Sequence, residues 1–131
     1  MDMKLELVPI PVVDVDRAKA FYVEKLGFTD DVDIEPAEGV RVVQLTPPGS
    51  ACSISIGTGL PVYEGSPPGS VKGLHLVVAD IDRARAELIS KGVDVSPVEE
   101  MGGGVKFAGF FDPDGNSFMF QEMAWRTGDD F

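Results

Sequence analysis

The chain contains little of what several classes of protein require. It has one cysteine, Cys52, so no disulfide can form within it, and one histidine, His75. Its 11 lysines and arginines are outnumbered by 22 acidic residues, which gives a net charge of −11, and the basic residues form no cluster. This balance argues against a nucleic-acid partner, because phosphate backbones are bound by grouped cations.

Long apolar runs are also missing. No stretch approaches the roughly 20 residues that span a bilayer, and residues 1–6 lack the basic and then apolar pattern of a secretory signal. The single cysteine is consistent with a reducing compartment. At 131 residues the chain suits one compact domain. We therefore expect a cytoplasmic protein that does not enter a membrane.

An internal repeat is the strongest positive feature of the sequence. The segment Asp14-Val-Asp-Arg-Ala-Lys-Ala20 recurs as Asp80-Ile-Asp-Arg-Ala-Arg-Ala86, which is 66 residues later (80 minus 14). The same shift takes Thr46-Pro-Pro-Gly49 onto Asp112-Pro-Asp-Gly115. The chain therefore consists of two copies of one structural unit in tandem, and we expect any site to lie where the two copies meet.

Each copy is predicted to contain a strand, a helix and three further strands. Asp14 and Asp80 are suited to cap the two helices, and Gly27 and Gly92 are suited to end them. The strands are expected near residues 4–12, 28–35, 40–45 and 52–56, and then near 74–78, 95–100, 104–111 and 117–123.

The predicted fold class is α+β. Two tandem βαβββ modules, about 4–57 and 73–123, are joined by a Gly/Pro/Ser-rich linker at 58–72, which we expect to be exposed or to form a mobile flap. Together the modules predict one domain with a curled, mixed, eight-stranded sheet. Both helices would cover one face of this sheet, and the other face would form a concave cleft.

Alternation along the strands predicts which side chains face the cleft. The expected cleft residues are Leu7, Pro9, Ser53, Ser55, His75, Val77, Met119 and Gln121. The pattern leaves the facing of strands 40–45 and 105–111 undecided, so Arg41, Phe107 and Phe110 are further candidates, of which we include Phe107 in the site. Trp125 follows the last strand and is expected to cover the cleft or a dimer seam, or to pack at the surface.

The paired modules, the segment Asp14–Phe28 and the motif Phe111-Asp-Pro-Asp-Gly-Asn116 resemble the vicinal oxygen chelate superfamily. It includes glyoxalase I, extradiol dioxygenases, fosfomycin-modifying enzymes and bleomycin-resistance proteins. In its enzymes a divalent metal lies in the cleft, held by His, Gln or Glu from the first and last strands of each module. The resemblance places these positions at Leu7, Ser53, Gly73 and Met119, which offer no carboxylate or imidazole. We therefore expect neither a metal nor another cofactor.

His75 is expected on the same face as Gly73, two residues further along the strand. A two-residue difference in register would bring it to the ligand position, although as a lone ligand. Three interpretations stay open: a metal ligand, a hydrogen-bonding or stacking partner of a bound molecule, and a structural histidine bonded to the backbone.

A cleft without a metal is expected to be mostly apolar with a few polar groups, which suits binding more than catalysis. The resemblance to bleomycin-resistance proteins implies a homodimer that sequesters a bulky, partly aromatic or cationic small molecule, such as an antibiotic. One alternative is a metal-dependent, glyoxalase-like lyase, isomerase or dioxygenase whose ligands come from other positions. Another is a metal-free enzyme in which His75 is the general base.

Overall fold

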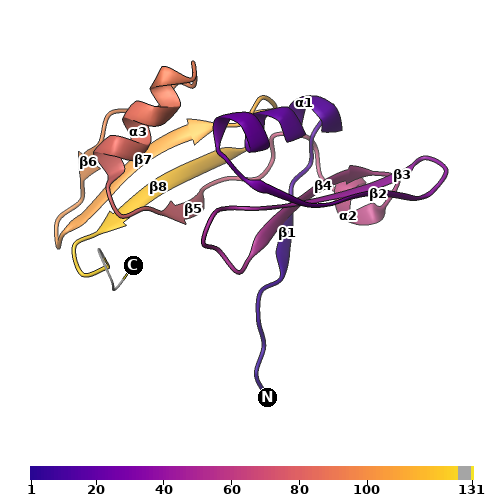
Figure 1. The fold of residues 1–131 in the computed structure, drawn as a ribbon, viewed down its shortest axis with the longest axis horizontal. Helices are drawn as coiled ribbons and strands as arrows, with labels where there is room; N and C mark the ends of the chain where they lie inside the picture. The colour runs from indigo at the N-terminus through magenta and orange to yellow at the C-terminus, as the bar shows by residue number, and fades with distance from the viewer. Residues whose placement is uncertain (127–130) are drawn as a thin grey trace. The chain divides into compact units, whose positions relative to one another are not determined.

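The structure is a computed structural model that describes residues 1–126 and 131. The chain divides into two compact units (Figure 1). The first comprises Met1–Val71 together with the turn Pro113–Gly115, and the second comprises Lys72–Asp112 and the described residues from Asn116 onwards. Each unit contains one βαβββ module.

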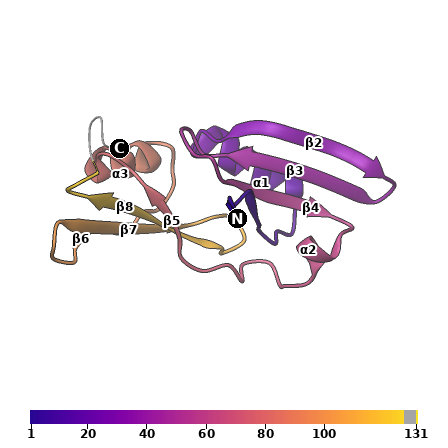
Figure 2. The ribbon, with the colours of Figure 1, turned by 90° about the horizontal axis from the view of Figure 1, so that it is seen from below.

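The first unit contains a four-stranded sheet, sheet 1, in the order β1-β4-β3-β2. The β1 strand pairs in parallel with β4, and the other pairs are antiparallel; Figure 2 shows β2, β3 and β4 side by side. Its elements are β1 (Leu7–Pro9), α1 (Val15–Ala20), η1 (Phe21–Lys25), β2 (Thr29–Ala37), β3 (Val40–Thr46), β4 (Ser53–Thr58) and α2 (Pro61–Glu64).

The first helix forms where the sequence predicts it. Asp14 caps α1, because its carboxylate accepts a hydrogen bond from the backbone N–H of Arg17 at 3.1 Å. The helix widens into the π-turn η1 and ends before Gly27, whose φ of 74° suits a residue without a side chain. Ala18 and Tyr22 are buried in the core of this unit. They share it with Ile10, which follows β1, and with four residues of sheet 1: Val43, Leu45, Ile54 and Ile56.

The second unit repeats this arrangement in sheet 2, with the order β5-β8-β7-β6. Asp80 caps α3 by accepting from the N–H of Arg83 at 3.1 Å. The helix lies over β7 and β8 (Figure 1), and the core between them contains Ile81, Leu88, Ala108, Phe110, Phe118 and Phe120. The elements are β5 (Leu74–Val77), α3 (Ile81–Ser90), β6 (Glu99–Glu100), β7 (Val105–Phe111) and β8 (Ser117–Met123).

The predicted fold class, two tandem βαβββ modules, is confirmed. The eight strands form two four-stranded sheets instead of one continuous sheet, because β1 and β5 each pair only with the last strand of their own module. The predicted linker contains the short helix α2, whose Tyr63 is buried. No helix in the described part of the chain has the length and apolar character needed to cross a membrane.

Candidate ligand-binding faces

The two candidate surfaces are the far faces of the sheets, meaning the faces turned away from α1 and from α3. On the far face of sheet 2, the pairing registers bring together five of the predicted residues: His75, Val77, Phe107, Met119 and Gln121. His75 pairs with Met119, and Gln121 pairs with both Val77 and Phe107. Phe107, whose facing the sequence left undecided, therefore lies among them. Phe110 lies on the opposite face, in the core.

The His75 side chain is exposed and is oriented by two contacts. Its Nδ1 lies 2.6 Å from the carbonyl oxygen of Gly73. Because a carbonyl oxygen only accepts, Nδ1 must carry the proton, and Nε2 of the neutral ring is then an acceptor. The ring also meets Phe107 edge to face, with 5.6 Å between the ring centroids. His75 thus has the backbone bond of a structural histidine and presents a second nitrogen that can accept a hydrogen bond.

The far face of sheet 1 contains a chain of polar side chains. Leu7 pairs with Ser53 across β1 and β4. The Ser53 hydroxyl accepts from Gln44 Nε2 at 3.1 Å and lies 2.7 Å from Thr46 Oγ1, which donates to Asp31. The alternation pattern identified Ser53 but missed Gln44 and Thr46, because the facing of β3 was undecided.

Ser55, the other predicted serine, is covered by the side chain of Tyr63. Ser55 pairs with Pro9 of β1. Only 2% of the surface of Ser55 is exposed. The Ser55 hydroxyl donates to the carbonyl oxygen of Val43 at 3.0 Å, so in the 2.6 Å contact between Tyr63 and Ser55 the phenol must be the donor. Sequence reasoning missed Tyr63 because it lies in a Gly/Pro-rich segment without strand or helix periodicity.

The positions that hold the metal in the family's enzymes do not fit a divalent ion here. Leu7 and Ser53 are neighbours, but the neighbour of Met119 is His75. Gly73 instead donates its N–H to Ser117 Oγ at 2.7 Å. The 66-residue shift, which matches Leu7 with Gly73, is therefore wrong for β5 and β8. His75 pairs with Met119 in the same way that Leu7 pairs with Ser53.

The corrected set of side chains is Leu7, Ser53, His75 and Met119, which supplies one imidazole, a hydroxyl and a thioether. Stable sites for zinc or calcium use several imidazole, thiolate or carboxylate ligands. Within residues 1–126 and 131, no group of three or more His, Cys, Asp or Glu side chains could hold a metal ion.

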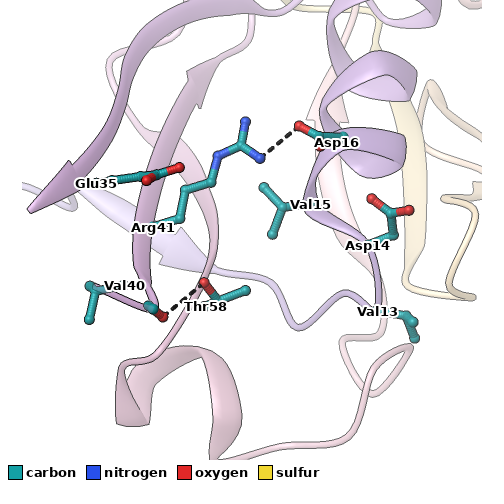
Figure 3. Close-up of a pocket in the computed structure, with 9 residues that line it drawn as sticks. Val13, Asp14, Val15, Asp16, Glu35, Val40, Arg41 and Thr58 are labelled. Carbon is teal, nitrogen blue, oxygen red and sulfur yellow. Dashed lines mark hydrogen bonds and ion pairs between the residues drawn. The ribbon is translucent and has the colours of Figure 1, made fainter. Parts of the chain in front are cut away.

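A groove of about 510 Å³ lies on the helix side of sheet 1, between the start of α1 and the strands β2 and β3 (Figure 3). Arg41 extends into it and donates to Asp16 at 2.7 Å, and the same guanidinium donates twice to Asp33, at 3.0 and 2.9 Å. Arg41, a candidate for the cleft, is thus committed to ion pairs on the helix side. The groove is lined by Val13, Asp14, Val15, Asp16, Glu35, Gly39, Val40, Arg41 and Thr58.

Ion pairing in this region perturbs one acid strongly. Hydrogen bonds from Arg41, and then from Lys19, hold the pKa of Asp33 far below its ordinary value of 3.8. The group stays ionised at neutral pH and ties α1 to β2, which is a structural role. Trp125, the last predicted site residue, lies beyond β8 with 59% of its surface exposed.

Comparison with known proteins identifies the family. Residues 4–120 match the profile of the Glyoxalase/Bleomycin resistance protein/Dioxygenase superfamily. Among solved structures, TnmS3, an antibiotic-binding protein from Streptomyces sp. CB03234, is 33% identical, with a TM-score of 0.82 over 94% of this chain and 98% of TnmS3.

A superfamily member from Sphaerobacter thermophilus DSM 20745 is 36% identical, with a TM-score of 0.80 over 92% of this chain and 98% of its own. UcmS2 is 28% identical, with a TM-score of 0.78 over 92% of this chain and 98% of its own. A search of curated protein sequences found no match. With its paired βαβββ modules and a family match over nearly its whole length, the chain belongs to the glyoxalase/bleomycin resistance protein/dioxygenase superfamily.

Proposed function

We propose that the protein binds a bulky, partly aromatic small molecule, such as an antibiotic, and holds it without altering it. The observation that carries this proposal is the likeness to TnmS3, an antibiotic-binding protein, which extends over 94% of this chain at 33% identity. A protein of this kind lowers the free concentration of a toxic compound by mass action and needs only a high affinity.

The chemistry of the far face of sheet 2 supports this proposal. Phe107 and the His75 ring offer aromatic surface, and Met119 offers an adaptable, polarisable contact. His75 Nε2 and the Gln121 amide supply directional hydrogen bonds at the same face. Such a surface favours a ring system with a few polar groups.

Metal-dependent catalysis would require donors that the family's ligand positions do not provide. Leu7, Ser53 and Met119 stand where His, Gln or Glu would be needed, and His75 alone adds an imidazole. The resemblance to bleomycin-resistance proteins also implies a homodimer, and the sequence leads us to expect it in the cytoplasm. Light scattering would measure the oligomeric state, and cell fractionation would test the location.

The test is a binding screen followed by recovery of the ligand. Purified protein is screened by thermal shift against aromatic antibiotics, and hits are titrated by calorimetry. After overnight incubation, mass spectrometry should return the ligand unchanged, with or without added zinc, nickel or iron. Turnover that is lost on chelation would refute the proposal and favour the metal-dependent enzyme.

A paired substitution locates the binding face. Phe107→Ala should weaken binding at least about fivefold, because it removes an aromatic contact worth ~1 kcal/mol beyond the apolar area that it buries. The matched control is Ile89→Ala, an exposed apolar residue of α3 on the other side of sheet 2. Equal affinities for the two variants would exclude this face as the ligand site.

A further inference from the structure

Tyr63 is buried although it belongs to a four-residue helix in a Gly/Pro-rich segment. Only 7% of its surface is exposed. Its phenol lies on the far face of sheet 1 and donates to Ser55 Oγ at 2.6 Å. The chain therefore places a hydroxylated aromatic ring of its own on one of the two candidate ligand-binding faces.

The strand beneath this ring is shaped to receive it. A Cβ atom at Gly57 would lie 2.5 Å from Cε2 and 2.8 Å from Cζ of Tyr63, so a larger residue would displace the ring. The hydroxyl of Ser55 already donates its hydrogen bond to the carbonyl oxygen of Val43, so it can only accept a hydrogen bond from another group. We call the recess formed by Ser55 and Gly57 the phenol notch. Its contacts suit a flat ring that carries a hydrogen-bond donor.

We propose that the phenol notch is a ligand subsite for a hydroxylated aromatic ring, and that Tyr63 fills it while no ligand is bound. This inference rests on the proposed function and adds a chemical class to it, namely planar phenols. A phenolic ligand that displaces Tyr63 re-forms the same hydrogen bond to Ser55 and the same contact with Gly57. Tyr63 thus competes with the ligand, and its occupancy reduces the apparent affinity of the wild-type protein.

The test uses p-cresol, which is the tyrosine side chain as a free molecule. Tyr63→Ala empties the notch, and p-cresol is titrated into the variant by calorimetry and by the amide NMR signals of Ser55 and Gly57. We expect p-cresol to bind about three- to tenfold more tightly than toluene, which lacks the donor, since one neutral hydrogen bond contributes about that much. The methyl ether 4-methylanisole, which can only accept, should bind no better than toluene.

Two further variants make the result specific. Adding Ser55→Ala to Tyr63→Ala removes the acceptor and should abolish the preference for p-cresol over toluene. The wild type is expected to bind p-cresol at least several-fold more weakly than Tyr63→Ala. The control Val62→Ala changes a residue of the same helix that is 60% exposed, and it should bind p-cresol as the wild type does. If Tyr63→Ala does not fold, the wild type is titrated with p-cresol to saturation and the amide signal of Tyr63 is followed, because displacement from the notch should move it.

Several results would overturn the proposal: equal affinities for p-cresol and toluene in Tyr63→Ala, a preference that persists without Ser55, or a Tyr63 amide signal that does not move in the wild type at saturating p-cresol. These results concern only the notch. An antibiotic that binds the wild type and Tyr63→Ala equally would leave the proposed function standing and refute the subsite. A notch that takes p-cresol, in a protein that binds no antibiotic, would give the reverse outcome.

Discussion

Replacing Asp33 by Asn should lower the stability of the protein by a predictable amount. The Asp33 carboxylate accepts from Arg41 Nε at 3.0 Å and Nη2 at 2.9 Å, and from Lys19 Nζ at 2.7 Å. These side chains are 22–25% exposed, so water screens the charges only partly. Exposed pairs typically contribute ~0.2–1 kcal/mol each. Asp33 makes two such pairs, and the pair with Arg41 is bidentate, so each should lie near the top of that range. The expected cost of losing both is about 1–2 kcal/mol.

The pH dependence of this cost follows from the lowered pKa of Asp33. A carboxyl group whose pKa is lower in the folded state stabilises the protein above its unfolded pKa. That contribution is lost as the pH falls through the lower, folded pKa. The difference between wild type and Asp33→Asn should therefore be constant from pH 5 to 8 and should shrink as the pH falls below 3.8, the ordinary value.

Urea unfolding at pH 7, 5 and 3, at low and high salt, measures this difference. The control is Asp94→Asn, which removes an exposed aspartate in the segment between α3 and β6. The reasoning is refuted if Asp33→Asn unfolds at the same urea concentration as the wild type at pH 7, or if its deficit persists unchanged at pH 3. Binding of an antibiotic ligand should be unaffected, because these side chains lie on the helix side of sheet 1.

Two further substitutions test the pairing of the strands. Gly57→Ala should destabilise the protein by about 1–3 kcal/mol in urea unfolding, because its Cβ would lie 2.1 Å from the backbone oxygen of Arg41; an unchanged midpoint would contradict the β3–β4 geometry. Met119→Glu should create weak Ni²⁺ binding, detectable by calorimetry, because the new carboxylate would stand beside His75. Ser117→Glu, two residues from Met119 on β8 and not paired with His75, is the control and should bind less Ni²⁺.

The sequence predicts well the features that depend on residues close together in the chain. The two capping aspartates, Asp14 and Asp80, begin helices as expected, because a cap needs only a side chain and the N–H three residues on. The alternation in β8 correctly separates Phe118 and Phe120, in the core, from Met119. Each of these features depends on a few consecutive residues.

Tyr63 shows where such patterns fail. A single aromatic residue among glycines and prolines has no periodicity, so the local sequence indicates an exposed linker. Its burial depends on Ser55, a predicted cleft residue, and on Gly57, which lies just beyond the predicted strand 52–56 but within β4. The sequence shows a glycine at position 57 but not that the Tyr63 ring occupies the space that a side chain there would fill. Only the three-dimensional structure shows this contact.

The position of His75 has a different physical basis. Side chains alternate with a period of two, so a slip of one residue turns a strand over, whereas a slip of two keeps every side chain on its face. Alternation therefore placed His75 correctly on the face of Met119 but could not decide whether Gly73 or His75 is its neighbour. The choice depends on pairing between strands more than 40 residues apart, Leu74–Val77 and Ser117–Met123. After this correction the family's ligand positions still offer too few donors for a metal, because Leu7 and Ser53 on sheet 1 supply no imidazole or carboxylate and Met119 on sheet 2 is paired with a single imidazole, that of His75.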